Sequence, residues 1–364
     1  MPERGRAEAT YNGAVSRFAG ASLVTAALSV AITVMALPAE TASAAGPLKP
    51  ALVGLLDRQG VIDDQWTGII RGVVVQVDWA VLQPAPDGQV VSANPIDNAL
   101  AAVRSYNGRH PTTPLGIKLR VMAGRGAPQW LKDRVGAQFV QSPVDQANGT
   151  VPFWWRPEVD TAYRALHAQL AARYDSVAEI REVQISRCTV LYEEPFMRIT
   201  GDAAALAAFR ANGLTRAVDE TCLKQQVQAH KVWARTRSVL ALNPYQDPAT
   251  APKTDVAFTN TMAKQCRTVL GTRCIIENHS IRQANTADDE KLYTKMVALG
   301  RPMAMQTNRP DVLGDLGVVL RRCVSMGAEA IELPWTYRPM GPAAFMAAYS
   351  DVVAALDPAV VQVP

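Results

Sequence analysis

Residues 116–130 read GIKLRVMAGRGAPQW, a β-rich run that gives way after Met122 to a turn of small and polar residues. Short apolar runs bounded by turn signals are typical of the buried strands of a parallel sheet. Seven more runs of this kind occur along the chain, namely Ala51–Leu56, Val73–Asp78, Ile180–Ser186, Ser238–Asn243, Cys274–Asn278, Pro302–Thr307 and Ala328–Leu333. The sequence therefore predicts eight strands.

Segments of helical period separate these runs. In Pro157–Tyr174 and in Asp311–Met326, apolar side chains recur three or four residues apart, which places them on one face of a helix. Strands that alternate with helices predict an α/β fold, and their number predicts a single-domain (β/α)8 TIM barrel over residues 45–364. A doubly wound sheet would have a glycine-rich phosphate-binding turn after an early strand, and the sequence shows none.

The N-terminus has the order of residues found in export signals. Three arginines precede the uncharged stretch Phe18–Ala39, and small residues follow it, ending in Ala42-Ser43-Ala44. This order predicts a signal segment, residues 1–44, cleaved after Ala44, and a secreted, extracellular protein. The alternative is an uncleaved anchor, because the uncharged stretch reaches the length of about 20 residues that spans a bilayer. Contact with a membrane is expected only through such an anchor.

The charge of the chain argues against nucleic acid as a partner. The formal net charge is +4, and the basic residues are scattered along the sequence and form no patch or run. We expect a monomer.

The five cysteines fit disulfide bonds better than metal ligation, because none of them has the paired spacing of a zinc site. In an oxidising compartment, Cys266 and Cys274 are candidates for one disulfide, and Cys188 and Cys222 for a second. The odd number leaves one thiol, and we assign this role to Cys323 as a buried, inert residue.

Polar and aromatic side chains follow the eight runs, at the points where barrel strands reach the end that carries active sites. Aromatic faces, amides and carboxylates together are suited to a sugar. We predict a carbohydrate substrate, with binding residues Asp78, Trp79, Arg120, Trp130, Asn243, Tyr245, Asn278, Gln306 and Trp335. For the aromatic residues the alternative is packing in the core, and for Asp78 it is capping of the segment that follows.

Three segments resemble the retaining TIM-barrel glycoside hydrolases of clan A, in particular the barrel of family 42 β-galactosidases. They are Val77–Pro84, which is similar to a second-strand motif of that family, Leu119–Gly124 running into Pro128–Trp130, and Arg173–Asp175 before the fourth run. The resemblance implies a barrel that cleaves O-glycosidic bonds with two carboxyl groups. Those enzymes end the fourth strand with Asn-Glu and the seventh with a nucleophilic Glu. Here Ser186-Arg187 and Gln306 stand at these places.

Two other carboxylates are candidates for the chemistry. Glu194 is the candidate general acid, because it precedes Pro195 and Phe196 and an apolar environment keeps a carboxyl group protonated. The alternative is a solvated loop residue. Glu277, at the end of the sixth run, is the candidate nucleophile or base, or else a carboxylate tied to Arg282 or His279.

A third carboxylate, Glu332, lies inside the apolar run Ala330–Leu333, where an unpaired charge would be costly. Because side chains alternate along a strand, Glu332 points into the barrel if Ile331 and Leu333 face the helices. It then serves either catalysis and ligand binding or an ion pair with a barrel arginine such as Arg120.

Two functions follow from these residues. The first is a secreted glycoside hydrolase with two of Glu194, Glu277 and Glu332 as its catalytic pair. The second is a noncatalytic carbohydrate-binding barrel, which Gln306 at the nucleophile position favours. We predict no cofactor and no metal. A barrel esterase or lyase is a third and lesser hypothesis, because the sequence has no Gly-x-Ser-x-Gly elbow.

Overall fold

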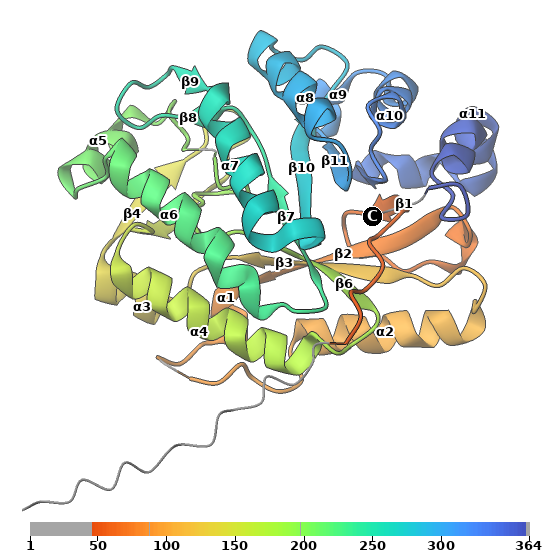
Figure 1. Ribbon diagram of the computed structural model, residues 1–364, viewed down its shortest axis with the longest axis horizontal. Coiled ribbons are helices and arrows are strands. Elements are labelled where there is room, and N and C mark those ends of the chain that lie inside the picture. Colours follow the sequence, from red (N-terminus) through yellow and green to blue (C-terminus); the bar gives the residue numbers. More distant parts are fainter. Residues whose placement is uncertain (1–45, 87, 197, 362–364) are drawn as a thin grey trace, which may run out of the picture. The chain divides into compact units, whose positions relative to one another are not determined.

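The protein folds around a closed barrel of eight parallel strands. The computed structural model describes residues 46–86, 88–196 and 198–361, so the expected signal segment lies outside the described residues. In spatial order the strands run β1-β12-β11-β10-β7-β6-β3-β2, with helices on the outside (Figure 1). Their bounds are β1 Gly54–Asp57, β2 Ile70–Asp78, β3 Gly116–Met122, β6 Ile180–Gln184, β7 Arg237–Ala241, β10 Cys274–Ile281, β11 Met303–Thr307 and β12 Ala330–Leu333. The predicted (β/α)8 barrel is confirmed, and each predicted run contains most of one strand.

Helices and two small hairpins make up the rest of the described fold. The helices are α1 Trp79–Leu82, α2 Pro95–Arg109, α3 Gln129–Val135, α4 Pro157–Tyr174, α5 Ala203–Ala211, α6 Arg216–Ala229, α7 Val256–Leu270, α8 Ala287–Leu299, α9 Pro310–Leu313, α10 Leu316–Ser325 and α11 Pro342–Ala355. Short 3-10 helices span Asp64–Trp66, His230–Val232, Gly271–Arg273 and Trp335–Met340. The hairpins pair β4 Ala137–Gln141 with β5 Asn148–Pro152, and β8 Tyr245–Gln246 with β9 Thr254–Asp255.

Two departures from the predicted elements affect the site. The helix expected over Asp311–Met326 is divided into α9 and α10, because Gly314 takes a positive φ of +77° and Asp315 then caps α10 through the amide of Val318. Strand β10 continues three residues beyond the predicted Asn278, which brings His279 into the barrel wall.

The inside of the barrel is layered from apolar to polar. Near the amino ends of the strands, small and branched side chains such as Leu56, Val239 and Ile275 form a separate apolar cluster. Toward the carboxyl ends, alternate positions carry charged and amide side chains that are fully buried. Ile331 and Leu333 belong to the outer apolar core between strands and helices, so Glu332 between them points inward, as the alternation of β12 predicts.

Both predicted disulfides are present. Cys188 is bonded to Cys222 and Cys266 to Cys274, which is typical of proteins from oxidising compartments. Cys323 is the free cysteine among the described residues, and burial raises the pKa of its thiol to about 12.

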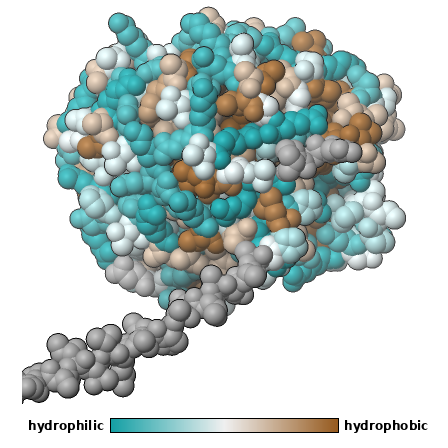
Figure 2. Space-filling model, in the orientation of Figure 1, coloured by the Kyte–Doolittle hydropathy of each residue, from teal (hydrophilic) through white to brown (hydrophobic). Residues whose placement is uncertain are grey.

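Within the described part of the chain, no helix has the length and apolar character to cross a membrane. On the face seen in Figure 2, apolar residues form small areas among hydrophilic ones.

Two buried histidines lie between α4 and the 3-10 helix that follows α6. His167 accepts a hydrogen bond from the indole nitrogen of Trp233 at 3.0 Å, and His230 Nε2 lies 2.9 Å from the Tyr163 hydroxyl. Burial lowers the pKa of His167 to about 3, and burial also lowers that of His230 well below its ordinary value. Both imidazoles are therefore neutral in the folded protein.

We expect the free energy of unfolding to fall between pH 7 and pH 5, and His167→Gln to remove about 2 kcal/mol of that fall. An unfolded histidine binds a proton near pH 6.5, whereas folded His167 stays neutral. Stability that is fully present above pH 6.5 is therefore lost as the pH falls toward 3. Urea unfolding at both pH values checks this, with His110→Gln at the surface as control. Equal losses in wild type and His167→Gln would contradict it.

Candidate functional site

A cavity of about 660 Å³ opens at the carboxyl end of the barrel, where TIM-barrel enzymes carry their active sites. Its polar lining includes Arg58 after β1, Glu193 and Glu194 after β6, Asn243 after β7, His279 in β10 and Gln306 in β11. The β4–β5 hairpin forms one side, because its tip residues Val144 and Asp145 also line the cavity. This volume is in the range of small-molecule and oligosaccharide sites.

The tip of the hairpin is held at the cavity by two neighbouring loops. Asp145 accepts a hydrogen bond from the hydroxyl of Tyr192 at 2.6 Å, and Tyr192 itself lines the cavity. Arg309, which follows β11, donates to the carbonyl of Val144 at 3.0 Å. The run from Pro143 to Pro152 is rich in turn residues, and its second half nevertheless forms β5. The hairpin thus joins the loops after β6 and β11 at one side of the mouth.

Glu193, Glu194 and His279 form a compact group on the floor of the cavity. His279 Nδ1 lies 3.2 Å from a carboxylate oxygen of Glu193 and 3.6 Å from one of Glu194. On its other side, His279 Nε2 lies 2.9 Å from Glu277, a contact that fixes the plane of the ring. The second oxygen of Glu194 is buried and has no hydrogen-bond partner among the described residues. Glu194 itself lines the cavity, so a bound ligand would contact its side chain there.

A network of buried charges lies directly beneath this group. Lys118 Nζ is 2.6 Å from Glu277, 3.0 Å from Glu332 and 3.6 Å from Glu182. Arg120 is 2.9 Å from Glu332 and 3.0 Å from Glu193, so it links the network to the floor of the cavity. The side chains of Glu277 and Glu332 are 0% exposed. Their charges are compensated within the barrel and do not face the cavity.

The electrostatics of the group follow from these contacts. Burial alone would raise the pKa of Glu193, but Arg120 and His279 outweigh burial and lower it to about 2, so this carboxyl group is ionised. Burial would lower the pKa of His279, and Glu277 raises it well above its ordinary value. Arg120 and Lys118 likewise hold the pKa of Glu332 below its usual range despite burial.

The three predicted catalytic residues are thus brought together, in two different environments. Glu194 lies at the cavity with a side chain that is 12% exposed. Glu277 and Glu332 lie under the floor, in ion pairs with Lys118 and Arg120. For both buried residues the structure shows the pairing that the sequence left open as the alternative, with His279 for Glu277 and Arg120 for Glu332.

The predicted binding residues separate in the same way. Asn243 and Gln306 line the cavity, and the amide nitrogen of Asn243 is buried without a partner among the described residues. Asn278 lies behind Asn243 and donates to the carbonyl of Leu242 at 2.7 Å. Arg120 is buried as described above, and the Tyr245 ring is buried with its hydroxyl on Asp219.

The tryptophans differ in exposure. Trp79 is 0% exposed, and its indole nitrogen donates to Gln83. Trp130 packs edge-on against Trp79 and donates to the Gln83 carbonyl, outside the cavity lining. Both placements are the core packing given as the alternative above. Trp335 is 51% exposed beside Arg58, a lining residue, so it lies next to the cavity. Asp78 stands before α1 without a side-chain capping bond.

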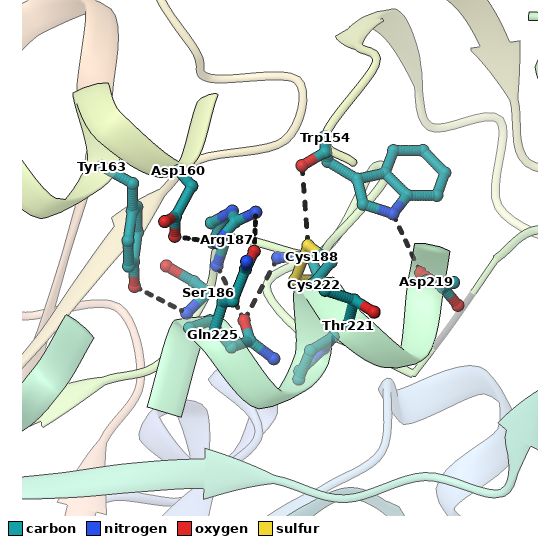
Figure 3. Close-up of a disulfide and its surroundings, with 12 residues drawn as sticks. Trp154, Asp160, Tyr163, Ser186, Arg187, Cys188, Asp219, Thr221, Cys222 and Gln225 are labelled. Carbon is teal, nitrogen blue, oxygen red and sulfur yellow. Dashed lines mark hydrogen bonds and ion pairs between the residues drawn. A yellow bond between two sulfur atoms is a disulfide. The ribbon is translucent and has the colours of Figure 1, made fainter. Parts of the chain in front are cut away.

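A disulfide and two buried ion pairs fix the loop that carries Glu193 and Glu194. Cys188, near the start of the loop, is bonded to Cys222 on α6 (Figure 3). Arg187 forms an ion pair with Asp160 of α4. Farther along, Arg198 pairs with the fully buried Asp219 at 2.9 Å and donates to the carbonyl of Cys188. The loop is therefore anchored to α4 and α6 on both sides of the carboxylate pair.

Glycine at position 124 brings a second loop against this one. Arg125 N donates to the carbonyl of Val190 at 3.0 Å, and a Cβ atom on Gly124 would lie 2.1 Å from that same carbonyl oxygen. A side chain at this position would force apart the loops that follow β3 and β6. The close approach explains why a glycine follows the third strand.

Glu193, Glu194 and His279 also place three possible metal ligands within 4.8 Å of one another. Carboxylate and imidazole ligands of this kind suit zinc or manganese. Arg120 lies 3.0 Å from Glu193, and its positive charge would compete with a cation there. The absence of a metal cofactor stays a prediction.

Comparisons with known proteins give likenesses of fold at low identity. No known family model matches the sequence, and no curated protein does. Endo-glycoceramidase II from Rhodococcus sp. is 15% identical, with a TM-score of 0.45 over 79% of this chain and 74% of that one. The carboxyl transferase domain of Rhizobium etli pyruvate carboxylase is 12% identical, with a TM-score of 0.42 over 85% and 46% of the two chains. A β-galactosidase from Marinomonas ef1 is 14% identical, with a TM-score of 0.38 over 78% and 54%. None of these likenesses singles out family 42 or an activity.

Proposed function

We propose that the protein is a glycoside hydrolase that cleaves an oligo- or polysaccharide outside the cell, with Glu194 as the general acid and Glu193 as its ionised partner. The observation that carries this proposal is the environment of Glu194, whose carboxylate faces the cavity with one oxygen buried and unpartnered. Sugar hydroxyls and a glycosidic oxygen both donate or accept hydrogen bonds, so a saccharide suits a lining of carboxylates and amides.

The two carboxyl groups have the different environments that this chemistry needs. Glu193 is held ionised by Arg120 and His279, as a nucleophile or a stabiliser of a positively charged sugar must be. Glu194 protonates the leaving oxygen as the glycosidic bond breaks, and its carboxylate then takes a proton from the water that releases the sugar from Glu193. One oxygen of each carboxylate lies within 4.8 Å of the other, which is shorter than the separation of about 6.5–9.5 Å in inverting enzymes and therefore favours retention of anomeric configuration.

In this mechanism Glu277 and Glu332 are positioning residues and do not react with the sugar. Glu277 orients His279, which contacts both reacting carboxylates. Glu332 orients Arg120, which contacts Glu193. Gln306 receives a hydrogen bond from Arg120 at 3.1 Å and lines the cavity, so it is placed to bind a sugar hydroxyl. Export across a membrane, in keeping with the two disulfides, belongs to the same proposal.

Proton NMR of a hydrolysis reaction tests this proposal. The purified protein is incubated with galactans, arabinans, glucans, uronic-acid polysaccharides and nitrophenyl glycosides, and the anomeric proton of the first product is followed. We expect one substrate class to release sugar, with the configuration of the substrate retained in the new hemiacetal. Inversion would show that Glu193 and Glu194 are not the reacting pair, and no release from any substrate would refute hydrolysis.

A second candidate function is carbohydrate binding without turnover. Two observations favour it. Glu277 and Glu332 are buried away from the cavity, and an amide, Gln306, stands on β11 where a nucleophilic carboxylate would be expected. The carboxylates on the cavity floor, Glu193 and Glu194, therefore both come from the loop after β6. A glycan that raises the melting temperature without releasing sugar would support this function, since a ligand stabilises the folded state by mass action.

A further inference from the structure

Arg58 presents an uncompensated positive charge to the cavity. It follows the last residue of β1 and lines the cavity, with its guanidinium 5.6 Å from the centre of the exposed Trp335 ring. One of its nitrogens donates to the carbonyl of Thr307 at 2.8 Å. Arg58 forms no ion pair with any residue in the described part of the chain. The remaining N–H groups are therefore open to a ligand.

The other arginines of the cavity already have carboxylate partners. Arg282 lies 3.5 Å from Asp289, and Arg309 lies 3.1 Å from Asp311. Burial lowers the pKa of Arg58 because the more distant carboxylates, including Glu332 and Glu193, offset its desolvation only in part. A cation that is desolvated and unpaired in an open cavity is the arrangement expected where a ligand brings the opposite charge.

The position of Arg58 also fits a ligand that is charged at one end. In the order of strands around the barrel, β1 and β6 are separated by β2 and β3, so Arg58 and the carboxylate pair Glu193–Glu194 line the same cavity from strands that are not neighbours. A sugar with its glycosidic oxygen at Glu194 would extend toward Arg58. A planar guanidinium binds a carboxylate through two parallel hydrogen bonds.

We infer that the saccharide is acidic and that Arg58 binds its anionic group, the carboxylate of a uronic acid. This inference rests on the proposed function, because it takes the cavity as the saccharide site. The guanidinium of Arg58 lies over the Trp335 ring and donates a hydrogen bond to the carbonyl of Thr307. These two contacts fix its orientation before a ligand binds. A sulfated sugar presents the same charge with a different geometry and serves as a separate arm of the test.

Calorimetric titration with matched sugars tests the inference without requiring turnover. The probes are galacturonate and glucuronate, the neutral sugars galactose and glucose, and galactose 6-sulfate. We expect a uronate to bind at least tenfold more tightly than its neutral counterpart, and Arg58→Gln to abolish that preference. Arg58→Lys should keep part of this preference, because the charge remains while the two parallel N–H donors of the guanidinium are lost. Arg321→Gln on α10, which makes the same change in net charge at an exposed site, is the control.

The outcomes separate this inference from the proposed function. Equal affinity for uronate and neutral sugar, or a preference that survives Arg58→Gln, would overturn the inference. Tighter binding of galactose 6-sulfate than of either uronate would overturn the assignment to a carboxylate. Turnover of neutral glycosides alone would leave hydrolysis standing and refute the acidic substrate. Uronate binding that depends on Arg58, without turnover of any substrate, would support the acidic ligand and refute hydrolysis.

Discussion

Lys118→Met is expected to lower the free energy of unfolding by about 3–5 kcal/mol, the cost of leaving buried charges without their partner. Lys118 is the shared partner of Glu277, Glu332 and Glu182, and its side chain is 0% exposed. Burial would lower the pKa of this lysine, but Glu277 and Glu332 raise it, so the ammonium group is charged. Methionine fills a similar volume and removes the charge together with the hydrogen bonds to Glu277 and Glu332.

Urea or guanidinium unfolding at pH 7 measures this loss. Lys291→Met is the matched control, because Lys291 pairs with Asp288 at 2.8 Å on the surface with a side chain that is 66% exposed. Surface pairs of this kind contribute about 0–1 kcal/mol. Adding Glu277→Gln to Lys118→Met should recover about 1 kcal/mol or more by removing one uncompensated charge. A Lys118→Met protein within 1 kcal/mol of wild type would show that the network does not hold the barrel together.

The fold was predictable because its main signal is local. Each strand is a short apolar run, and alternation places Glu332 inside the barrel once Ile331 and Leu333 face the helices. The two disulfides followed from spacing and from the expected compartment. The break between α9 and α10 is not visible in the pattern, because the apolar spacing of Leu313, Leu316 and Leu320 continues across Gly314, whereas its positive φ ends the helix there.

The site was only partly predictable, because it is built by contacts between distant residues. Glu194 is predictable from its place in the loop after the fourth run and Gln306 from its place at the end of the seventh, and both line the cavity. Lys118 was overlooked, although its place two residues before Arg120 in an apolar run puts both charges on one face of β3. That alternation was the available signal for the buried network.

Other members of the site had weaker signals. Glu193 was passed over for its neighbour, since sequence alone does not show which of two adjacent carboxylates meets Arg120. Arg58 has no sequence signal beyond its place after β1. Its significance comes from the absence of a carboxylate partner in the described part of the cavity, which only the folded structure reveals.

The central claim is that Glu194 is the general acid. A variant that cannot donate this proton should hydrolyse a natural glycoside much more slowly. General acid catalysis contributes about 10²–10⁴-fold to a rate. Glu194→Gln keeps the shape and the hydrogen-bonding capacity of the side chain but cannot deliver the proton. The loss should therefore be large for a glycoside with an alkoxide leaving group and small for a dinitrophenyl glycoside, whose leaving group departs without protonation. Glu158→Gln, on the exposed start of α4, is the control for the substitution itself.

The most direct measurement is kcat/KM of wild type, Glu194→Gln and Glu158→Gln on a natural glycoside and on the dinitrophenyl glycoside of the same sugar. We predict that Glu194→Gln loses at least 10²-fold on the natural glycoside and less than about tenfold on the activated one, while Glu158→Gln matches wild type on both. Equal losses on the two substrates, or no loss on either, would contradict the assignment of Glu194 as the general acid.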